Sequence, residues 1–142
     1  MHYHFRVHKD GNGFWAECIE LDGCQTEGED LDTLKANAED ALNLYLSEPE
    51  ESRMVFPLPK KMAKRAGIIA VAVQPSVALS VQLKSIRAKR NLTQTKAANL
   101  IGIKTLYTYQ KLESPKTSNP ELKTLSKLKK AFPELNLDAL VS

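Results

Sequence analysis

The stretch from Lys104 to Lys111 concentrates side chains that can contact nucleic acid. Gln110 can form a bidentate pair with the edge of an adenine base, whereas Lys104 and Lys111 carry charges suited to backbone phosphates. Tyr107 is either a base or sugar contact or a half-buried packing residue. The other candidate contacts lie within this stretch or on either side of it: Thr93, Gln94, Thr105, Thr108 and Lys116.

Two short helices separated by a tight turn would position these side chains. Thr93 can cap the first helix, and Gly102 takes the left-handed conformation at its end most easily. Apolar residues recur at helical spacing, first at Ala97, Leu100 and Ile101 and then, after a second start near Thr105, at Leu106, Tyr109 and Leu112. This pattern predicts a helix-turn-helix whose second helix can enter a DNA major groove, with Gln94 as a possible brace. The alternative is a helical hairpin that only packs a small bundle.

Catalytic and metal-binding arrangements have little support in the sequence. A two-metal nuclease needs carboxylates that converge from several strands and a helix, but residues 2–8 and 68–73, both expected strands, carry none. Cys18 and Cys24 lack a second pair of ligands at zinc spacing, and a catalytic Cys–His pair would lack any group to orient it. We therefore expect free thiols and no enzymatic activity, catalytic residue, metal or cofactor.

The charge of +3 is unevenly distributed along the 142 residues. Residues 1–74 carry 8 Lys+Arg against 13 Asp+Glu, whereas residues 75–142 carry 12 against 4. An acidic half followed by a basic half predicts two domains with different partners, and the basic half holds the expected helix-turn-helix. The lysines from Lys123 to Lys130 are expected to form a solvated helix face.

Hydrophobic patterning predicts the order β-β-β-α-β for residues 1–74. The expected strands cover residues 2–8, 14–19, 24–27 and 68–73, the last of them a continuous apolar run typical of a buried strand. The expected helix covers residues 31–47, begins after Asp30 as its cap, and is followed by an irregular connection of residues 48–67, with one contact expected from residues 54–58.

Residues 75–142 are predicted to be entirely helical outside their turns. Pro75 suits the first turn of a helix that reaches about Arg90, with Leu79, Leu83 and Ile86 facing inward. After the helix-turn-helix, Asn119 and Pro120 suit the start of a helix that ends near Phe132, with Leu122, Leu125 and Leu128 facing inward. A short helix within residues 135–141 completes a five-helix domain.

The segment FWAECIELDGCQTEGEDLDTLKANAEDALNLYL, residues 14–46, resembles the HicB antitoxin family. The resemblance is carried by the Leu21-Asp22-Gly23-Cys24 turn, the Thr26-x-Gly28 step, and the helix residues Leu31, Leu34, Asn37-Ala38, Ala41-Leu42 and Leu44-Tyr45-Leu46. The Thr-Gln, Ile-Gly-Ile and Leu-Glu pattern of residues 93–113 resembles the Cro/C1-type helix-turn-helix family, with one residue more than usual between Gly102 and the Leu-Glu pair.

These resemblances imply a fold, a partner and a function. They imply a partly degraded ribonuclease-H-like domain without nuclease activity (residues 1–74) and a Cro/C1-like DNA-binding domain (residues 75–142), together an α+β protein. They imply that the chain neutralises a HicA-like toxin, an RNA-cleaving protein with a catalytic histidine, and represses its own operon. The candidate toxin contacts are the acids that would meet a basic RNA-binding face, although a solvated rim is the alternative: Glu17, Glu20, Asp22, Glu27 and Glu29.

The resulting hypothesis is an antitoxin that acts by covering its partner and that also represses transcription from operator DNA. We expect a homodimer or homotetramer, because a single helix-turn-helix makes too little groove contact for tight binding. No signal peptide or apolar run of bilayer length is visible, so we expect a cytoplasmic protein without a membrane partner. The alternative is a transcriptional regulator whose N-terminal domain binds a small ligand or another protein.

Overall fold

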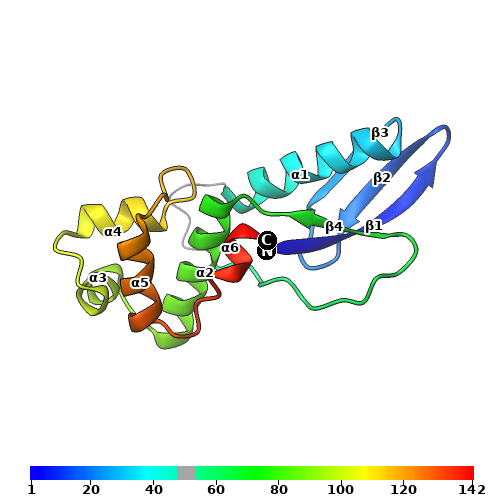
Figure 1. The fold of residues 1–142 in the computed structure, drawn as a ribbon. Helices are drawn as coiled ribbons and strands as arrows, with labels where there is room; N and C mark the ends of the chain where they lie inside the picture. Colours follow the sequence, from blue (N-terminus) through cyan, green and yellow to red (C-terminus); the bar gives the residue numbers. More distant parts are fainter. Residues whose placement is uncertain (48–53) are drawn as a thin grey trace.

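An antiparallel sheet and a group of helices share the chain in the computed structural model, which describes residues 1–47 and 54–142 (Figure 1). The sheet has four strands in the order β3-β2-β1-β4, and α1 packs on it. The α+β class expected from the sequence is therefore confirmed. The elements are β1 (His2–Asp10), β2 (Gly13–Cys18), β3 (Gln25–Gly28), α1 (Leu31–Ser47), β4 (Ile68–Ala72), α2 (Pro75–Arg90), α3 (Gln94–Ile101), α4 (Leu106–Glu113), α5 (Leu122–Ala131) and α6 (Asp138–Val141).

The β1–β2 hairpin forms the centre of the sheet. Alternation places Tyr3, Phe5 and Ala16 on the buried face, where each is fully buried. The turn closes with Asp10 opposite Gly13, and Gly11 within it has a φ of 58°, a conformation that glycine adopts without steric cost. The three N-terminal strands predicted from residues 2–27 are confirmed, with ends shifted by one or two residues.

Helix α1 begins where its sequence predicts. The Asp30 carboxylate accepts a hydrogen bond from the Thr33 N–H at 2.7 Å, which caps the helix. The buried residues Leu34, Ala38, Leu42 and Leu46 form the stripe that faces the sheet. Gly28 lets the helix approach β3 closely, because a Cβ at this position would lie 2.6 Å from the Leu34 nitrogen.

Strand β4 differs from the expected buried strand. It is an edge strand that pairs antiparallel with β1, and Val71 is its one buried residue while Ala70 is exposed. An apolar run of this length is typical of a strand covered on both faces, but it does not determine the position of the strand in the sheet. The preceding connection contacts the core through Phe56, and Tyr3 Oη donates a hydrogen bond to the Pro57 carbonyl at 2.6 Å, as expected for residues 54–58. Residues 48–53, the first part of the predicted connection, lie outside the described residues.

The helical half is organised around α2. Its residues Leu79, Leu83 and Ile86 are buried as predicted, and Pro75 occupies its first turn. The start of α5 was predicted wrongly, because Glu121 rather than Asn119 is its cap residue and Leu122 is 84% exposed. The helical spacing of the apolar residues in the helix-turn-helix also predicts that Leu100 and Leu106 face the core, and this is wrong because both lie on the surface.

The two halves meet where the chain termini lie side by side (Figure 1). The Met1 amino group donates to the Ala139 carbonyl and to a main-chain oxygen of Ser142. Asn43 of α1 donates to the Ala72 carbonyl at 3.3 Å and accepts from the Gln74 N–H at 2.8 Å, which fixes the passage from β4 to α2. Buried apolar residues from both halves form one continuous cluster. Among the described residues, no helix is long and apolar enough to cross a membrane.

Candidate nucleic-acid interface

Helices α3 and α4 are joined by the short turn that the sequence predicts. The Thr93 hydroxyl accepts the Lys96 N–H at 3.1 Å and caps α3, and Gly102 ends it with a φ of 87°. Thr105 caps α4 by accepting the Thr108 N–H at 3.2 Å, and the two threonine hydroxyls are 2.7 Å apart. Local residues therefore fix the start of each helix through a threonine side chain and the end of α3 through the backbone of a glycine.

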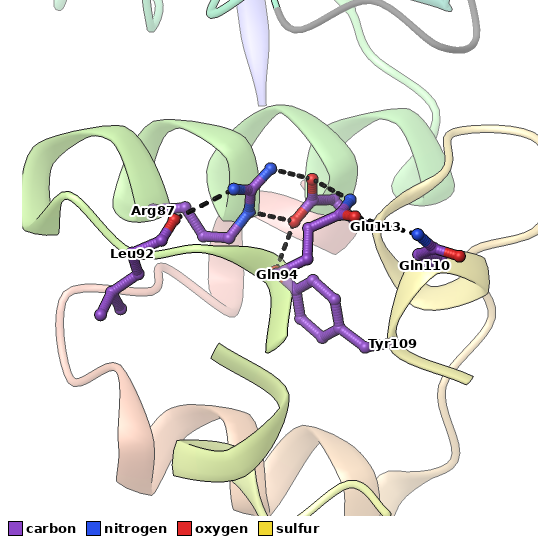
Figure 2. A network of polar contacts seen from close by, with 6 residues as sticks. All are labelled: Arg87, Leu92, Gln94, Tyr109, Gln110 and Glu113. Atoms are coloured by element: carbon purple, nitrogen blue, oxygen red, sulfur yellow. Dashed lines mark hydrogen bonds and ion pairs between the residues drawn. The ribbon is translucent and has the colours of Figure 1, made fainter. Parts of the chain in front are cut away.

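A buried ion pair anchors α4 to α2 (Figure 2). Arg87 donates to the Glu113 carboxylate from Nε at 2.7 Å and from Nη2 at 2.6 Å, and from Nη1 to the Leu92 carbonyl at 3.1 Å. The Glu113 side chain is 3% exposed. Hydrogen bonding to this carboxylate raises the pKa of Arg87 above its ordinary value, so the guanidinium stays charged. A bidentate pair of this kind holds the two helices in one orientation.

Tyr109 and Gln94 extend the anchor toward the surface. The Tyr109 hydroxyl donates to Glu113, and its pKa is raised by burial first and by the nearby Glu113 charge second. Gln94 donates to Glu113 at 3.3 Å and accepts from Gln110 Nε2 at 3.1 Å (Figure 2). The expected brace from Gln94 to the second helix is therefore present, and it places the Gln110 amide.

The first turns of α4 expose polar and aromatic side chains. The exposed candidates are Lys104, Thr105, Tyr107, Thr108, Gln110 and Lys111. Tyr107 is 69% exposed, so its alternative interpretation as a half-buried packing residue is wrong. The Lys111 ammonium lies 5.5 Å from the centre of the Tyr107 ring, within cation–π distance. Tyr107 and Lys111 thus form one exposed feature.

The basic residues beyond α4 divide between exposed and structural roles. Lys116 is exposed in the loop after α4, where Thr117 donates to the Lys111 carbonyl at 2.6 Å. The lysines of α5 are exposed as expected. Lys129 closes the end of its helix by donating to the carbonyls of Pro133 and Leu135, each at 2.7 Å.

The candidate toxin contacts do not share one environment. Asp22, Glu27 and Glu29 are exposed, and Glu17 is half-buried beside His8, with 3.0 Å between Oε1 and Nε2. The expectation that Glu20 belongs to a solvated acidic surface is wrong, because its side chain has no exposed area. It accepts the His4 N–H at 2.9 Å and the Lys60 N–H at 3.1 Å and thereby joins β1 to the connection before β4.

The two cysteines of the N-terminal half were considered above as metal ligands. Cys18 and Cys24 are buried and free, and the Cys18 N–H donates to the Cys24 carbonyl at 2.8 Å. Burial and hydrogen bonding to Cys18 raise the pKa of the Cys24 thiol, with the hydrogen bond the larger effect. Within residues 1–47 and 54–142, no cluster of three or more His, Cys, Asp or Glu side chains is arranged to hold a metal ion.

Arg87, Tyr109 and Glu113 are the residues of this interface that sequence reasoning missed as a group. Glu113 is one of 4 acids in the basic half. It comes directly after the buried Leu112 and four positions after the buried Tyr109, so it lies on the apolar side of α4. An acid at an apolar helix position is a usable signal of a buried ion pair. Comparison with protein-family models and with curated proteins gives no match to this chain.

Proposed function

We propose that this chain is an antitoxin that binds operator DNA through α4 and neutralises a HicA-like, RNA-cleaving toxin through its N-terminal half. The observation that carries the DNA-binding part is the exposed polar start of α4 on a frame fixed by Arg87 and Glu113. The toxin-neutralising part is supported by the HicB resemblance of residues 14–46 and by the exposed acids near β3.

In this proposal α4 lies in the major groove. Gln110 Nε2 has two hydrogens, so it can donate to Gln94 and to adenine N7 while Oε1 accepts from adenine N6. Lys104 and Lys116 meet phosphates on either side of the groove, and Thr93 lies near the backbone at the start of α3. The Tyr107–Lys111 pair presents a ring and a charge to the DNA together.

The acidic surface of β3 and its turns acts by covering the toxin. Asp22, Glu27 and Glu29 are exposed, so they are available to a basic RNA-binding face. Opposite charges speed the encounter, and the bound antitoxin then excludes RNA without any chemical step. Glu20 is not among these contacts, because it is buried.

A groove favours the second candidate, a regulator that binds a small apolar ligand. The groove measures about 620 Å³ and lies between α1, the start of β3 and the residues after position 53. Its walls are largely apolar and include Leu44, Tyr45, Met54 and Phe56. A ligand that changes DNA binding by the full chain would support this candidate.

DNA binding is tested with variants of α4 on an operator fragment and on random DNA. Gln110→Ala is expected to cost about 1–3 kcal/mol on the operator alone, because it removes a base contact. Lys104→Ala is expected to weaken binding to both DNAs and to flatten the salt dependence by about one ion. Lys127→Ala, an exposed lysine of α5, is the matched control. Equal losses on both DNAs for Gln110→Ala would exclude a base-reading role.

The proposal expects a small basic protein encoded in the neighbouring reading frame, and co-expression of that protein with this chain tests toxin neutralisation. The proposal expects a stable complex in which the partner no longer cleaves RNA. Charge reversal of Glu27 and Glu29 to Lys should weaken the complex, whereas Glu121→Lys, an exposed acid of the helical half, should not. A partner that fails to bind, or that cleaves RNA equally well in the complex, would contradict the proposal.

A further inference from the structure

The outer edge of β4 presents main-chain groups to solvent. Along an antiparallel strand, the main-chain N–H and C=O groups of one residue bond to the neighbouring strand, and those of the next residue point away from it. The bonds from the Val7 N–H to the Gly67 carbonyl and from the Val73 N–H to the Met1 carbonyl, both 2.8 Å, show that the odd-numbered residues bond to β1. The N–H and C=O groups of Ile68, Ala70 and Ala72 therefore point away from the sheet.

Two of these outward groups have partners within the chain. The Ile68 N–H donates to the Arg65 carbonyl at 3.3 Å, and the Ala72 carbonyl accepts from Asn43 Nδ2 at 3.3 Å. No partner from the described part of the chain satisfies the Ile68 carbonyl, either main-chain group of Ala70, or the Ala72 N–H. Ala70 is exposed, so this edge is accessible.

We propose that β4 pairs antiparallel with β4 of a second copy of this chain, about a two-fold axis at Ala70. In that register Ala70 faces Ala70 of the second copy, and Ile68 faces Ala72. The free groups match without remainder: each Ala70 donates to and accepts from the other, and each Ala72 N–H donates to the opposite Ile68 carbonyl. The groups that would be left over, the Ile68 N–H and the Ala72 carbonyl, are those already bonded within the chain.

The side chains of β4 suit the same pairing. Ile69 is half-buried on the face that carries Tyr3 and Phe5, and it would meet Val71 of the second copy there. Ile68 is half-buried on the opposite face and would meet Ala72 of the second copy. Pairing therefore buries apolar area on both faces of the joined sheet, in addition to forming the ladder.

The opposite edge of the sheet shows why β4 is the strand that pairs. Exposed edges are normally protected by charge, by proline or by a covering group. The β3 edge carries Glu27, and its carbonyl accepts a hydrogen bond from Asn37 Nδ2 at 2.8 Å. The sequence of β4, IIAVA, has no charge and no proline. The unprotected edge is thus the apolar one.

The pairing sets the arrangement of the helical halves. The C-terminal end of β4 leads through Gln74 directly into α2, so the helices lie beyond that end of the strand (Figure 1). In an antiparallel pair these ends point in opposite directions, and the two helical halves lie at opposite ends of one continuous sheet. The pairing depends on the edge geometry alone and is independent of DNA binding.

The test measures the mass of the full chain in solution and the exchange of its main-chain hydrogens. The wild type is expected to be a dimer, and Ala70→Lys, which places two like charges at the axis, is expected to be a monomer. Gln25→Lys, on the β3 edge, is the matched control and should remain a dimer. Hydrogen exchange at the Ala70 and Ala72 amides should slow as the wild-type concentration rises, whereas the Val71 amide, bonded to β1, should be protected throughout.

The exchange measurement keeps the proposal testable if Ala70→Lys fails to fold. Fast, concentration-independent exchange at Ala70 and Ala72 in the wild type would overturn the proposal. So would a monomeric wild type, or a folded Ala70→Lys that remains a dimer. Ala70→Pro provides a second variant, because it removes an N–H that faces outward and leaves the ladder with β1 intact.

Discussion

Replacement of Glu113 by alanine is expected to destabilise the helical half strongly. The change removes the carboxylate that pairs with Arg87 and that also accepts from Tyr109 and Gln94. Removing one partner of a buried ion pair typically costs about 3–5 kcal/mol, because the remaining charge is uncompensated. Arg87 is 22% exposed and keeps its bond to the Leu92 carbonyl, so the ion-pair part should lie near the lower end of that range.

The Tyr109 hydroxyl raises the expected loss. Tyr109 is fully buried, and a buried hydroxyl without a partner costs about 1–3 kcal/mol. The sum is about 4–6 kcal/mol, a large share of the 5–15 kcal/mol (roughly) that holds an ordinary domain folded. Gln94 loses its bond to Glu113 as well, so the position of the Gln110 amide should loosen and operator affinity should fall.

Urea unfolding followed by circular dichroism measures this loss. Glu134→Ala is the matched control, because it removes a second bidentate arginine pair, Arg90–Glu134, in which the side chains are 34% and 44% exposed. An exposed pair of this kind contributes about 0–1 kcal/mol. Should Glu113→Ala lose less than about 1 kcal/mol, or no more than Glu134→Ala, the assignment of Glu113 as the anchor of α4 is wrong.

Three further predictions concern the N-terminal half. Glu20→Ala should lower the free energy of unfolding by about 2–3 kcal/mol, since it removes a buried carboxylate and leaves the His4 and Lys60 N–H groups without their acceptor, whereas exposed Asp22→Ala should change thermal stability little. Gly28→Ala should cost about 1–3 kcal/mol in chemical unfolding, because its Cβ would collide with the Leu34 backbone, and an unchanged unfolding midpoint would contradict that close approach. The hydrogen bond from the Thr33 N–H lowers the pKa of Asp30. The stabilisation that this cap gives the folded protein is therefore fully present above a pH of about 3.9, the ordinary pKa of aspartate, and is lost as the pH falls through the lowered pKa. The melting temperature of Asp30→Asn, which keeps a capping group, should therefore fall less on acidification than that of the wild type.

Features that depend on neighbouring residues were predictable from the sequence. The caps at Asp30 and Thr93, the glycine end of α3 and the buried face of α2 each follow from a few adjacent residues and helical spacing. The exposure of the polar residues at the start of α4 was predictable for the same reason, but the exposure of Leu106 was not. The division into two domains and the ribonuclease-H-like arrangement remain predictions.

Features that depend on distant residues could not be predicted in the same way. Arg87 and Glu113 lie 26 positions apart, and nothing local to either residue indicates its partner. Glu20 stands among acids that are exposed or half-buried, and only its burial and its bonds to His4 and Lys60 show that it is structural. The apolar composition of β4 suits a central strand as well as an edge, and the order of the strands decides between them.

Binding of the full chain to the DNA upstream of its own reading frame, compared with random DNA of equal length, tests the DNA-binding claim most directly. The proposal expects markedly tighter binding to the upstream fragment. For both DNAs, the logarithm of the binding constant should fall linearly with the logarithm of the salt concentration. Equal affinity for the two fragments, or no binding at low salt, would contradict a role for α4 in operator recognition.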